Sequence, residues 1–447
     1  MDIESSEESE DVNADATTDE NESGASKPFD PALTTTHSYL GNDLEILRGR
    51  TLLDNGVCLN LPILFEKSMI LFPEQTLPMF EKNTQIVNML RTCIEKDRTF
   101  GVVRAGKKKD PLIGTTAEIY EYSDSDSGCF CIKARGRQRF KVLKFKKTQG
   151  QILADVKILP EVILGPPLHE ERLVSLDRLR KIPVNEKEAS EQEYRVSRQD
   201  SAVTPWPSWV YRQYDVRLLT MKIHEHLRFI VSKGSVIPKE PVELSFWLAQ
   251  NLFVSNAAKI ALLQDDCAIS RLQYAAKALS TLGRKSFVCA ICRQAIGKHT
   301  DIVPMNKKGL QEAYCNPYGA IHETVTLSNT TNVVLSVDPP STVCSWFPGY
   351  AWTIASCAGC NSHIGWKFTA VNKDLKPRQF WGLTRKNLLL KYAFMSTDET
   401  NSLAAESDGG EDVRSHLSSE SDNDDDDDDD DDEDARQIIR YRLDLGL

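Results

Sequence analysis

Two Cys-x-x-Cys pairs constrain this chain more than any other feature of its sequence. Cys289 and Cys292 form the first pair, and Cys357 and Cys360 form the second. Four thiolates complete the tetrahedral shell of a structural zinc ion, and each pair supplies two of them from one tight turn. Residues 293–356 must therefore fold so that the two turns meet. The pattern predicts one structural Zn²⁺ with four cysteine ligands and a domain that depends on the metal for folding.

Other chemistry has weaker support. His322 and His363 lie near the pairs and are alternative ligands to one of the cysteines. A catalytic zinc keeps an open position, which four thiolates would close. The chain has neither a G-x-x-x-x-G-K-[ST] phosphate loop nor a G-x-S-x-G elbow. A zinc-ribbon reductase would need a reactive thiol that this motif does not supply. We therefore expect a protein that is not an enzyme.

Aromatic residues crowd around the second pair, in the stretch 345–366. It contains Trp346, Trp352 and Trp366, with Pro348 and Gly349 interrupting regular structure between the first two. Large aromatic side chains are most often packed in a core. The alternative is an aromatic-walled pocket for a small ring. No carboxylate lies in the stretch, which favours a neutral ligand over a cation.

Composition divides the chain into four segments. Residues 1–38 are acidic and poor in apolar side chains, which predicts a disordered N-terminus. Residues 39–283 form a first domain that includes a helical part at about 205–283, and residues 284–392 form a β-rich zinc domain. Residues 393–447 are again acidic and predicted to be disordered. The expected fold class is α+β with several domains: a β domain, a helical insert and a C-terminal zinc domain with an aromatic cage.

The apolar pattern predicts individual elements. One helix is expected over residues 83–96. The strands expected in the first domain are 59–65, 68–72, 99–104, 115–122, 129–134, 139–145 and 152–159. A helix starting after Pro205 carries two apolar stripes, which indicates burial on more than one side, in this chain or against a partner. The first stripe is Val210, Tyr214, Leu218 and Met221, and the second is Leu219, Ile223, Leu227 and Ile230.

The formal net charge of -11 arises at the two ends of the chain. Residues 1–26 hold ten Asp or Glu and no Lys or Arg, and residues 397–434 hold nineteen against one Arg. Residues 27–396 carry 50 Lys and Arg against 35 Asp and Glu. That basic balance permits contact with nucleic acid or an acidic protein. The simpler interpretation is that the acidic ends are solvated and keep the chain soluble.

Targeting signals are not expected. The N-terminus is acidic and serine-rich, unlike a signal peptide, and no apolar run approaches the ~20 residues of a membrane span. Eleven cysteines without a secretory signal predict reduced thiols and metal binding. We expect the chain in the cytoplasm and the nucleus, with no membrane partner.

Several of these motifs resemble known families. The sequence SWFPGYAW, the second Cys-x-x-Cys pair, SHIGWKF and FWGLT resemble the thalidomide-binding, Yippee-like zinc domain of the cereblon family. LFPEQTLPMF, GTTAEIY and GRQRFKVL resemble the N-terminal substrate-binding domain of Lon proteases, which has Gly where this chain has Glu74. The resemblance runs over roughly residues 39–389 and leaves out both acidic ends.

The resemblance implies roles for individual residues. It implies a cage for glutarimides and related cyclic imides and the Cys₄ zinc site described above. The cage residues would be Trp346, Trp352, Trp366 and Phe368, with Asn316, Cys344 and Ser345 beside them. The family has His where this chain has Cys344. The carbonyl of Cys344 can still accept an imide N–H, but its thiol is a weak donor.

The same resemblance implies a function. The helical insert would dock on the triple-propeller adaptor of cullin-4 ubiquitin ligases, with Trp209, Tyr214 and Leu218 as contacts. The chain would be the non-catalytic substrate-recognition subunit of a cullin-4 RING E3 ligase. It would bind clients with cyclic imides or drug-induced surfaces and direct their ubiquitination and proteasomal degradation. The alternative is a zinc-ribbon protein that binds single-stranded nucleic acid by stacking bases on tryptophan; otherwise nucleic acid is not an expected partner.

Overall fold

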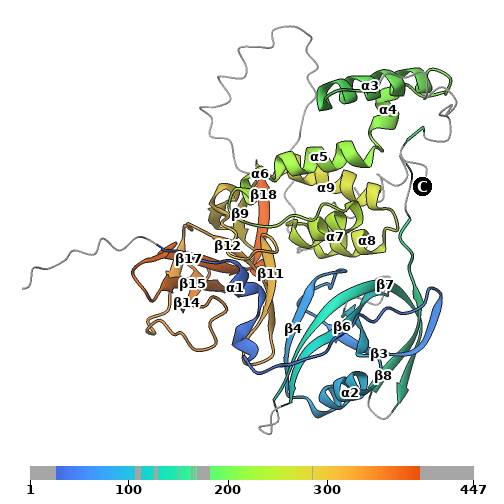
Figure 1. Ribbon diagram of the computed structural model, residues 1–447. Helices are drawn as coiled ribbons and strands as arrows, with labels where there is room; N and C mark the ends of the chain where they lie inside the picture. The colour runs from blue at the N-terminus through green and yellow to red at the C-terminus, as the bar shows by residue number, and fades with distance from the viewer. Residues whose placement is uncertain are drawn as a thin grey trace, which may run out of the picture.

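The computed structural model describes residues 27–105, 112–124, 129–148, 151–162, 165, 167–168, 182–283 and 285–392. These residues form a β domain, a block of helices and a zinc domain that pack against one another (Figure 1). Among them, no helix is both long enough and apolar enough to cross a membrane.

The β domain is a seven-stranded sheet in the order β2-β6-β5-β3-β8-β7-β4. An additional pairing of β6 with β7 closes the strands between them into a barrel. Helix α2 lies at one end of this barrel (Figure 1). The elements are β2 (Glu45–Ile46), β3 (Val57–Glu66), β4 (Thr76–Glu81), α2 (Thr84–Glu95), β5 (Thr99–Arg104), β6 (Ile113–Asp124), β7 (Phe130–Thr148) and β8 (Gln151–Ile158).

Most of the expected elements of this domain are present, and two predictions are wrong. Helix α2 matches the helix expected over 83–96, and the side chain of Asn83 caps it by accepting the N–H of Gln85. Segments 129–134 and 139–145 belong to one strand, β7, because the chain continues through Gly136. The Gly136 N–H donates to the Gln75 carbonyl, and the Gly136 carbonyl accepts the N–H of Glu74. Segment 68–72 is not a strand. Its side chains alternate between two buried apolar clusters, and its backbone does not pair with a neighbouring strand in the described ranges.

The helical block follows the β domain. The expected helix after Pro205 is broken near Asp215, because the Asp215 carboxylate accepts the N–H groups of Arg217 and Leu218 and starts a new helix. Helix α3 lies before the helical part that we expected at about 205–283. The helices are α3 (Glu186–Ser201), α4 (Ser208–Arg212), α5 (Val216–His226), α6 (Arg228–Val231), α7 (Pro241–Asn251), α8 (Asn256–Gln264) and α9 (Ala268–Leu282).

The zinc domain contains a six-stranded sheet in the order β11-β12-β17-β15-β14-β13 and a three-stranded sheet in the order β10-β9-β18. The strands are β9 (Lys285–Cys289), β10 (Ala295–Lys298), β11 (Gln311–Cys315), β12 (Ile321–Leu327), β13 (Val333–Leu335), β14 (Tyr350–Cys357), β15 (His363–Ala370), β17 (Gln379–Thr384) and β18 (Leu388–Tyr392).

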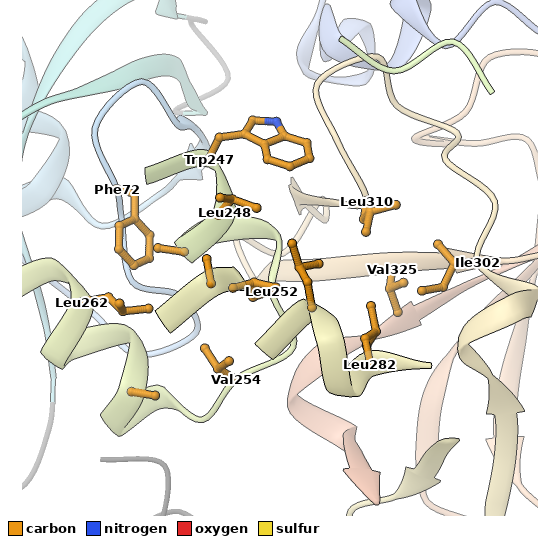
Figure 2. Close-up of a cluster of buried hydrophobic side chains, with 14 of the residues drawn as sticks. Phe72, Trp247, Leu248, Leu252, Val254, Leu262, Leu282, Ile302, Leu310 and Val325 are labelled. Carbon is orange, nitrogen blue, oxygen red and sulfur yellow. The ribbon is translucent and has the colours of Figure 1, made fainter. Parts of the chain in front are cut away.

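One buried apolar cluster joins all three parts. Figure 2 shows Phe72 from the β domain, helical residues such as Leu248 and Leu252, and Val325 from β12 around this shared core. The indole N–H of Trp247 also donates to the carbonyl of Lys308 across the same junction. The helical block therefore connects the β domain to the zinc domain.

An N-terminal strap crosses the zinc domain and the β domain. Strand β1 (Lys27–Pro28) pairs in parallel with β16 (Leu375–Lys376), and α1 (Ala32–Thr35) follows. His37 is buried, and Lys133 Nζ of the β domain donates to the carbonyl of Thr36. The prediction of disorder over 1–38 is therefore wrong for residues 27–38, because apolar and hydrogen-bonding partners lie far along the chain. Residues 1–26 and the predicted tail 393–447 lie outside the described residues.

Candidate functional site

The four cysteines lie in two knuckles with the same backbone geometry. In each knuckle the N–H of the fourth residue after the first cysteine donates to that cysteine's carbonyl: Arg293 to Cys289 at 3.0 Å and Asn361 to Cys357 at 2.8 Å. Arg293 and Asn361 both have a left-handed backbone, with φ of 62° and 56°. Two matched knuckles on β9 and β14 thus face each other.

The sulfur positions fit one zinc ion. All four Sγ atoms lie within 4.8 Å of one another. Cys292 Sγ is 3.4 Å from Cys357 Sγ, and Cys289 Sγ is 3.7 Å from Cys360 Sγ. A tetrahedral zinc with Zn–S bonds of about 2.3 Å separates its sulfurs by about 3.8 Å. All four are free cysteines, so they are able to act as thiolate ligands.

Ser362 supports this centre and was not anticipated from the sequence. Its hydroxyl lies 3.0 Å from Cys360 Sγ and 3.6 Å from Cys289 Sγ. The hydrogen bond from Ser362 lowers the pKa of Cys360 to about 6, which favours the thiolate that a metal needs. His322 and His363, the alternative ligands, do not belong to the four-cysteine group, and both rings lie against Trp366 instead.

The aromatic residues gather on one face of the six-stranded sheet. In the antiparallel pair β14–β15, Trp352 lies opposite Phe368 and Ile354 lies opposite Trp366. Alternate residues of a strand share a face, so these four side chains point to the same side. Trp352 and Trp366 are partly buried there, whereas Phe368 is fully buried and stacks on Phe380.

A loop over residues 341–349 covers this face. Ser341 and Trp352 exchange two backbone hydrogen bonds of 2.8 and 3.0 Å, and the Trp352 indole N–H donates to the Val343 carbonyl at 2.9 Å. Phe347 is completely buried and anchors the loop. Cys344 is exposed at the top of the loop, with a left-handed φ of 50°. The loop and the Trp352 indole therefore hold each other in place.

Trp346 is part of the core and also contacts a second tryptophan of the predicted cage. It is buried, stacks on Tyr314 at 5.1 Å and meets Trp366 edge-on at 4.7 Å. Its indole N–H donates to the carbonyl of Cys315 at 3.1 Å. At this position the core interpretation of the tryptophans holds, and the contact with Trp366 brings the ring beside the aromatic face. Tyr314 was not anticipated, since only the fold brings β11 beside the loop.

His322 lies between two of the cage tryptophans. Its ring is 5.8 Å from Trp346 and 5.1 Å from Trp366. Burial lowers the pKa of His322 to about 4, so the ring is neutral at pH 7. Its Nε2 is buried and has no hydrogen-bond partner among the described residues. A buried nitrogen without a partner at this position is suited to meet a ligand or a water molecule.

The remaining predicted pocket residues form the surrounding loops. The Asn316 side-chain oxygen accepts the N–H groups of Tyr318 at 3.0 Å and Ala320 at 2.8 Å, and so shapes its own turn. The Ser345 hydroxyl donates to the Phe347 carbonyl at 3.2 Å. Both side chains therefore form hydrogen bonds with nearby backbone groups and do not point freely outward.

The opposite face of the sheet is mainly aliphatic and packs on the helices. Val325, Leu327 and Leu383 from β12 and β17 belong to the shared apolar core. On β12 the next residue after His322 is Glu323, which turns to this face and accepts from Lys259 of α8 at 2.9 Å. Lys259 is fully buried, and burial lowers its pKa to about 8. A single sheet thus has the cage on one side and the helical block on the other.

The two apolar stripes expected along the helical insert differ in burial. Ile223, Leu227 and Ile230 of the second stripe are buried. Leu218 and Met221 of the first stripe line an open groove of about 730 Å³ along α5 and α6. Of the other predicted contacts, Trp209 is 63% exposed and Tyr214 is half-buried. The first stripe is therefore accessible to a partner.

Known proteins resemble the chain over most of its length. Residues 60–281 match the family described as the ATP-dependent protease La (LON) substrate-binding domain. Residues 285–402 match the family described as Yippee zinc-binding/DNA-binding/Mis18, centromere assembly. A solved Lon N-terminal domain protein from Xanthomonas campestris aligns with 48% of this chain and 95% of its own, at 16% identity and a TM-score of 0.30, which is too low to support an argument.

Curated relatives give the family. Protein cereblon of Xenopus tropicalis is 39% identical over 406 residues, which cover 86% of this chain and 90% of the relative. Protein cereblon of Gallus gallus is 38% identical, covering 81% of this chain and 84% of the relative. Protein cereblon of Danio rerio is 39% identical, covering 81% of this chain and 88% of the relative. With a Lon-type domain and a Yippee-type zinc domain in the same order, this chain belongs to the cereblon family.

Proposed function

We propose that this chain is the substrate-recognition subunit of a cullin-4 RING E3 ubiquitin ligase. It binds clients and directs them to ubiquitination and proteasomal degradation without catalysing a reaction itself. The proposal rests on family membership and on one observation above all. Trp352 and Trp366 stand on neighbouring strands with a tryptophan-bearing loop over them, which makes a rigid aromatic cage at the surface of the zinc domain.

The ligand of this cage is a neutral cyclic imide, such as a glutarimide or a cyclised C-terminal imide of a damaged protein. Indole faces accept a small ring, and the exposed loop at Cys344 presents backbone to its rim. The Cys344 carbonyl would accept the imide N–H. His322 Nε2, which is buried without a partner, offers a further polar contact. One structural zinc on the four cysteines supplies folding free energy for this domain.

The groove along α5 and α6 is the proposed contact with the triple-propeller adaptor. Its apolar lining comes from Leu218, Met221 and Val231, and Trp209, a few residues earlier in the sequence, is exposed. Exposed aromatic and aliphatic side chains of this kind anchor protein interfaces. The cytoplasm and the nucleus, where such ligases act, are the proposed locations.

The alternative, a nucleic-acid-binding protein, has less support. Base stacking needs exposed aromatic faces, but Trp346 is buried and Trp352 and Trp366 are partly buried.

Co-purification with the recombinant adaptor tests the proposed function. Tyr214→Asp with Leu218→Asp should abolish adaptor binding while imide binding and Tm stay near the wild-type values. Ile223→Asp is the matched control, because its buried stripe belongs to the core and all three properties should fall. An adaptor that binds the first variant as well as it binds wild type would contradict the proposal.

A further inference from the structure

A lysine-rich patch lies on the β domain and takes no part in the proposed ligase function. Lys141 and Lys144 of β7 and Lys157 of β8 are all exposed. Lys141 and Lys157 stand directly opposite each other in the antiparallel pair. Like charges directly opposite on neighbouring strands destabilise a sheet. A bound anion would remove this repulsion, so the arrangement favours an anionic occupant.

Apolar side chains accompany these lysines. Val57 of β3 lies opposite Lys157 on the other side and is 58% exposed. In β7 a bulge between Val142 and Lys144 leaves Leu143 52% exposed. Bulges redirect side chains and are typical of binding sites. An occupant of the lysine patch, defined as Val57, Lys141, Leu143, Lys144 and Lys157, should therefore be both anionic and apolar.

The carboxylate nearest to the patch is already engaged. Asp155 lies opposite Lys144, but its side chain pairs with Lys146 Nζ at 2.8 Å and accepts the N–H of Asn60 at 3.1 Å. Asp155 therefore serves both Lys144 and Lys146, and it stands opposite neither Lys141 nor Lys157.

The chain itself contains a segment of matching chemistry. Residues 424–434 are eleven consecutive Asp and Glu, and the following residues 435–447 carry Ile438, Ile439 and Leu443 among three Arg and one Asp. We propose that the C-terminal segment 424–447 docks on the lysine patch, with the acidic run beside the lysines and its apolar end beside Val57 or Leu143. The segment then keeps other polyanions away from the β domain.

The connection is long enough. Between Tyr392 and residue 424 the chain is able to span at most about 100 Å. A compact body of this size has a radius of gyration of about 21 Å. The segment therefore reaches the patch from any position of the last described strand.

Lysine footprinting on the full-length chain tests the proposal. The two proteins compared are wild type and a variant in which the acids of 424–434 are replaced by Asn and Gln. In wild type at low salt, Lys141, Lys144 and Lys157 should be acetylated about threefold or more slowly than in the variant. High salt should remove the difference. Exposed Lys96, Lys239 and Lys373 serve as internal controls and should not change.

Cleavage of the tail gives an independent readout. Lys141→Glu, Lys144→Glu and Lys157→Glu together should accelerate cleavage by an arginine-specific protease at Arg436 and Arg440. The matched triple substitution at Lys96, Lys239 and Lys373 should leave the cleavage rate unchanged.

Three outcomes would overturn the proposal. The first is equal acetylation of the patch in wild type and the tail variant. The second is protection that is lost only when the acids of residues 1–26 are neutralised, which would identify the N-terminal segment as the occupant. The third is protection that arises only on adding a single-stranded oligonucleotide, which would make the patch a nucleic-acid surface.

Discussion

The two faces of the six-stranded sheet in the zinc domain are built from different side chains and meet different neighbours. One face is mainly aliphatic and continuous with the helical core through buried residues such as Val325 and Leu383, and it also carries the half-buried Trp381. The other is aromatic, with Trp352 and Trp366 only partly buried under a loop. The Nε2 of His322, unpaired within the part of the chain that the structure describes, and the indoles of Trp352 and Trp366 lie on the face that is turned away from the helical block. The comparison separates residues that stabilise the domain from residues available for a ligand.

Removing the metal should have the largest effect, because it affects both faces. Cys357→Ser should abolish zinc binding and unfold the zinc domain, since structural zinc contributes about 10 kcal/mol or more in small domains. The β domain has a buried cluster of its own, and most of a second cluster, and should keep its structure. Elemental analysis should give one zinc per wild-type chain. Circular dichroism would follow the loss of folded structure in the variant. A variant that is metal-free and still fully folded would remove the basis of the account.

The junction behind the aliphatic face comes next. Lys259→Met leaves Glu323 buried without its closest cation, which should cost about 3 kcal/mol. This is the lower end of the usual range because Arg385 remains 3.9 Å from Glu323. Lys259→Met with Glu323→Leu should recover most of the loss, since an apolar pair of similar volume often replaces a buried ion pair. Denaturant unfolding of both variants checks this. An equal loss of unfolding free energy in the single and the double variant would argue against a coupled pair.

On the aromatic face, ligand affinity should respond more than stability does. Trp352→Ala removes one wall of the cage and should weaken imide binding by about 2 kcal/mol, roughly thirtyfold. Leu383→Ala on the other face is the matched control. It should lower the unfolding free energy by about 2–5 kcal/mol through cavity formation while affinity stays nearly constant. Calorimetry and thermal melting of both proteins would show whether the two faces are separable.

The smallest expected change is at the rim. Cys344→His should strengthen imide binding about fivefold, because an imidazole donates a better hydrogen bond to an imide oxygen than a thiol does. The left-handed backbone at this position tolerates histidine. The change should not alter Tm, because residue 344 is exposed. A weaker affinity in competition binding would indicate that the side chain does not face the ligand.

Motif spacing predicted the metal centre well, because a Cys-x-x-Cys turn is a local structure. The register of β14 and β15 was not predictable from the same residues. Alternation places Trp352 and Ile354 on one face, but only the antiparallel pairing sets them opposite Phe368 and Trp366. His322 was considered as a zinc ligand for the same reason: nothing local indicates which face of β12 it occupies.

Long-range contacts account for the other errors. The acidic start of the chain suggested disorder to residue 38, whereas His37 is buried at the junction of the strap and the zinc domain. Glu74 stands at a turn where the resembled family has glycine. Its left-handed φ of 64° is offset by ion pairs to Arg50 and Arg137, which come from separate segments. Sequence patterns report local preference, and these residues are fixed by partners brought in by the fold.

The central claim is that the aromatic face binds a cyclic imide through its rings and through a backbone acceptor for the imide N–H. Titration calorimetry of the zinc-loaded full-length chain with glutarimide and with N-methylglutarimide tests it most directly. The account predicts one-to-one binding of glutarimide, with quenching of tryptophan fluorescence, and at least a tenfold loss for the N-methyl compound, which has no N–H to donate. Absence of glutarimide binding, or equal affinity for the two compounds, would contradict the claim.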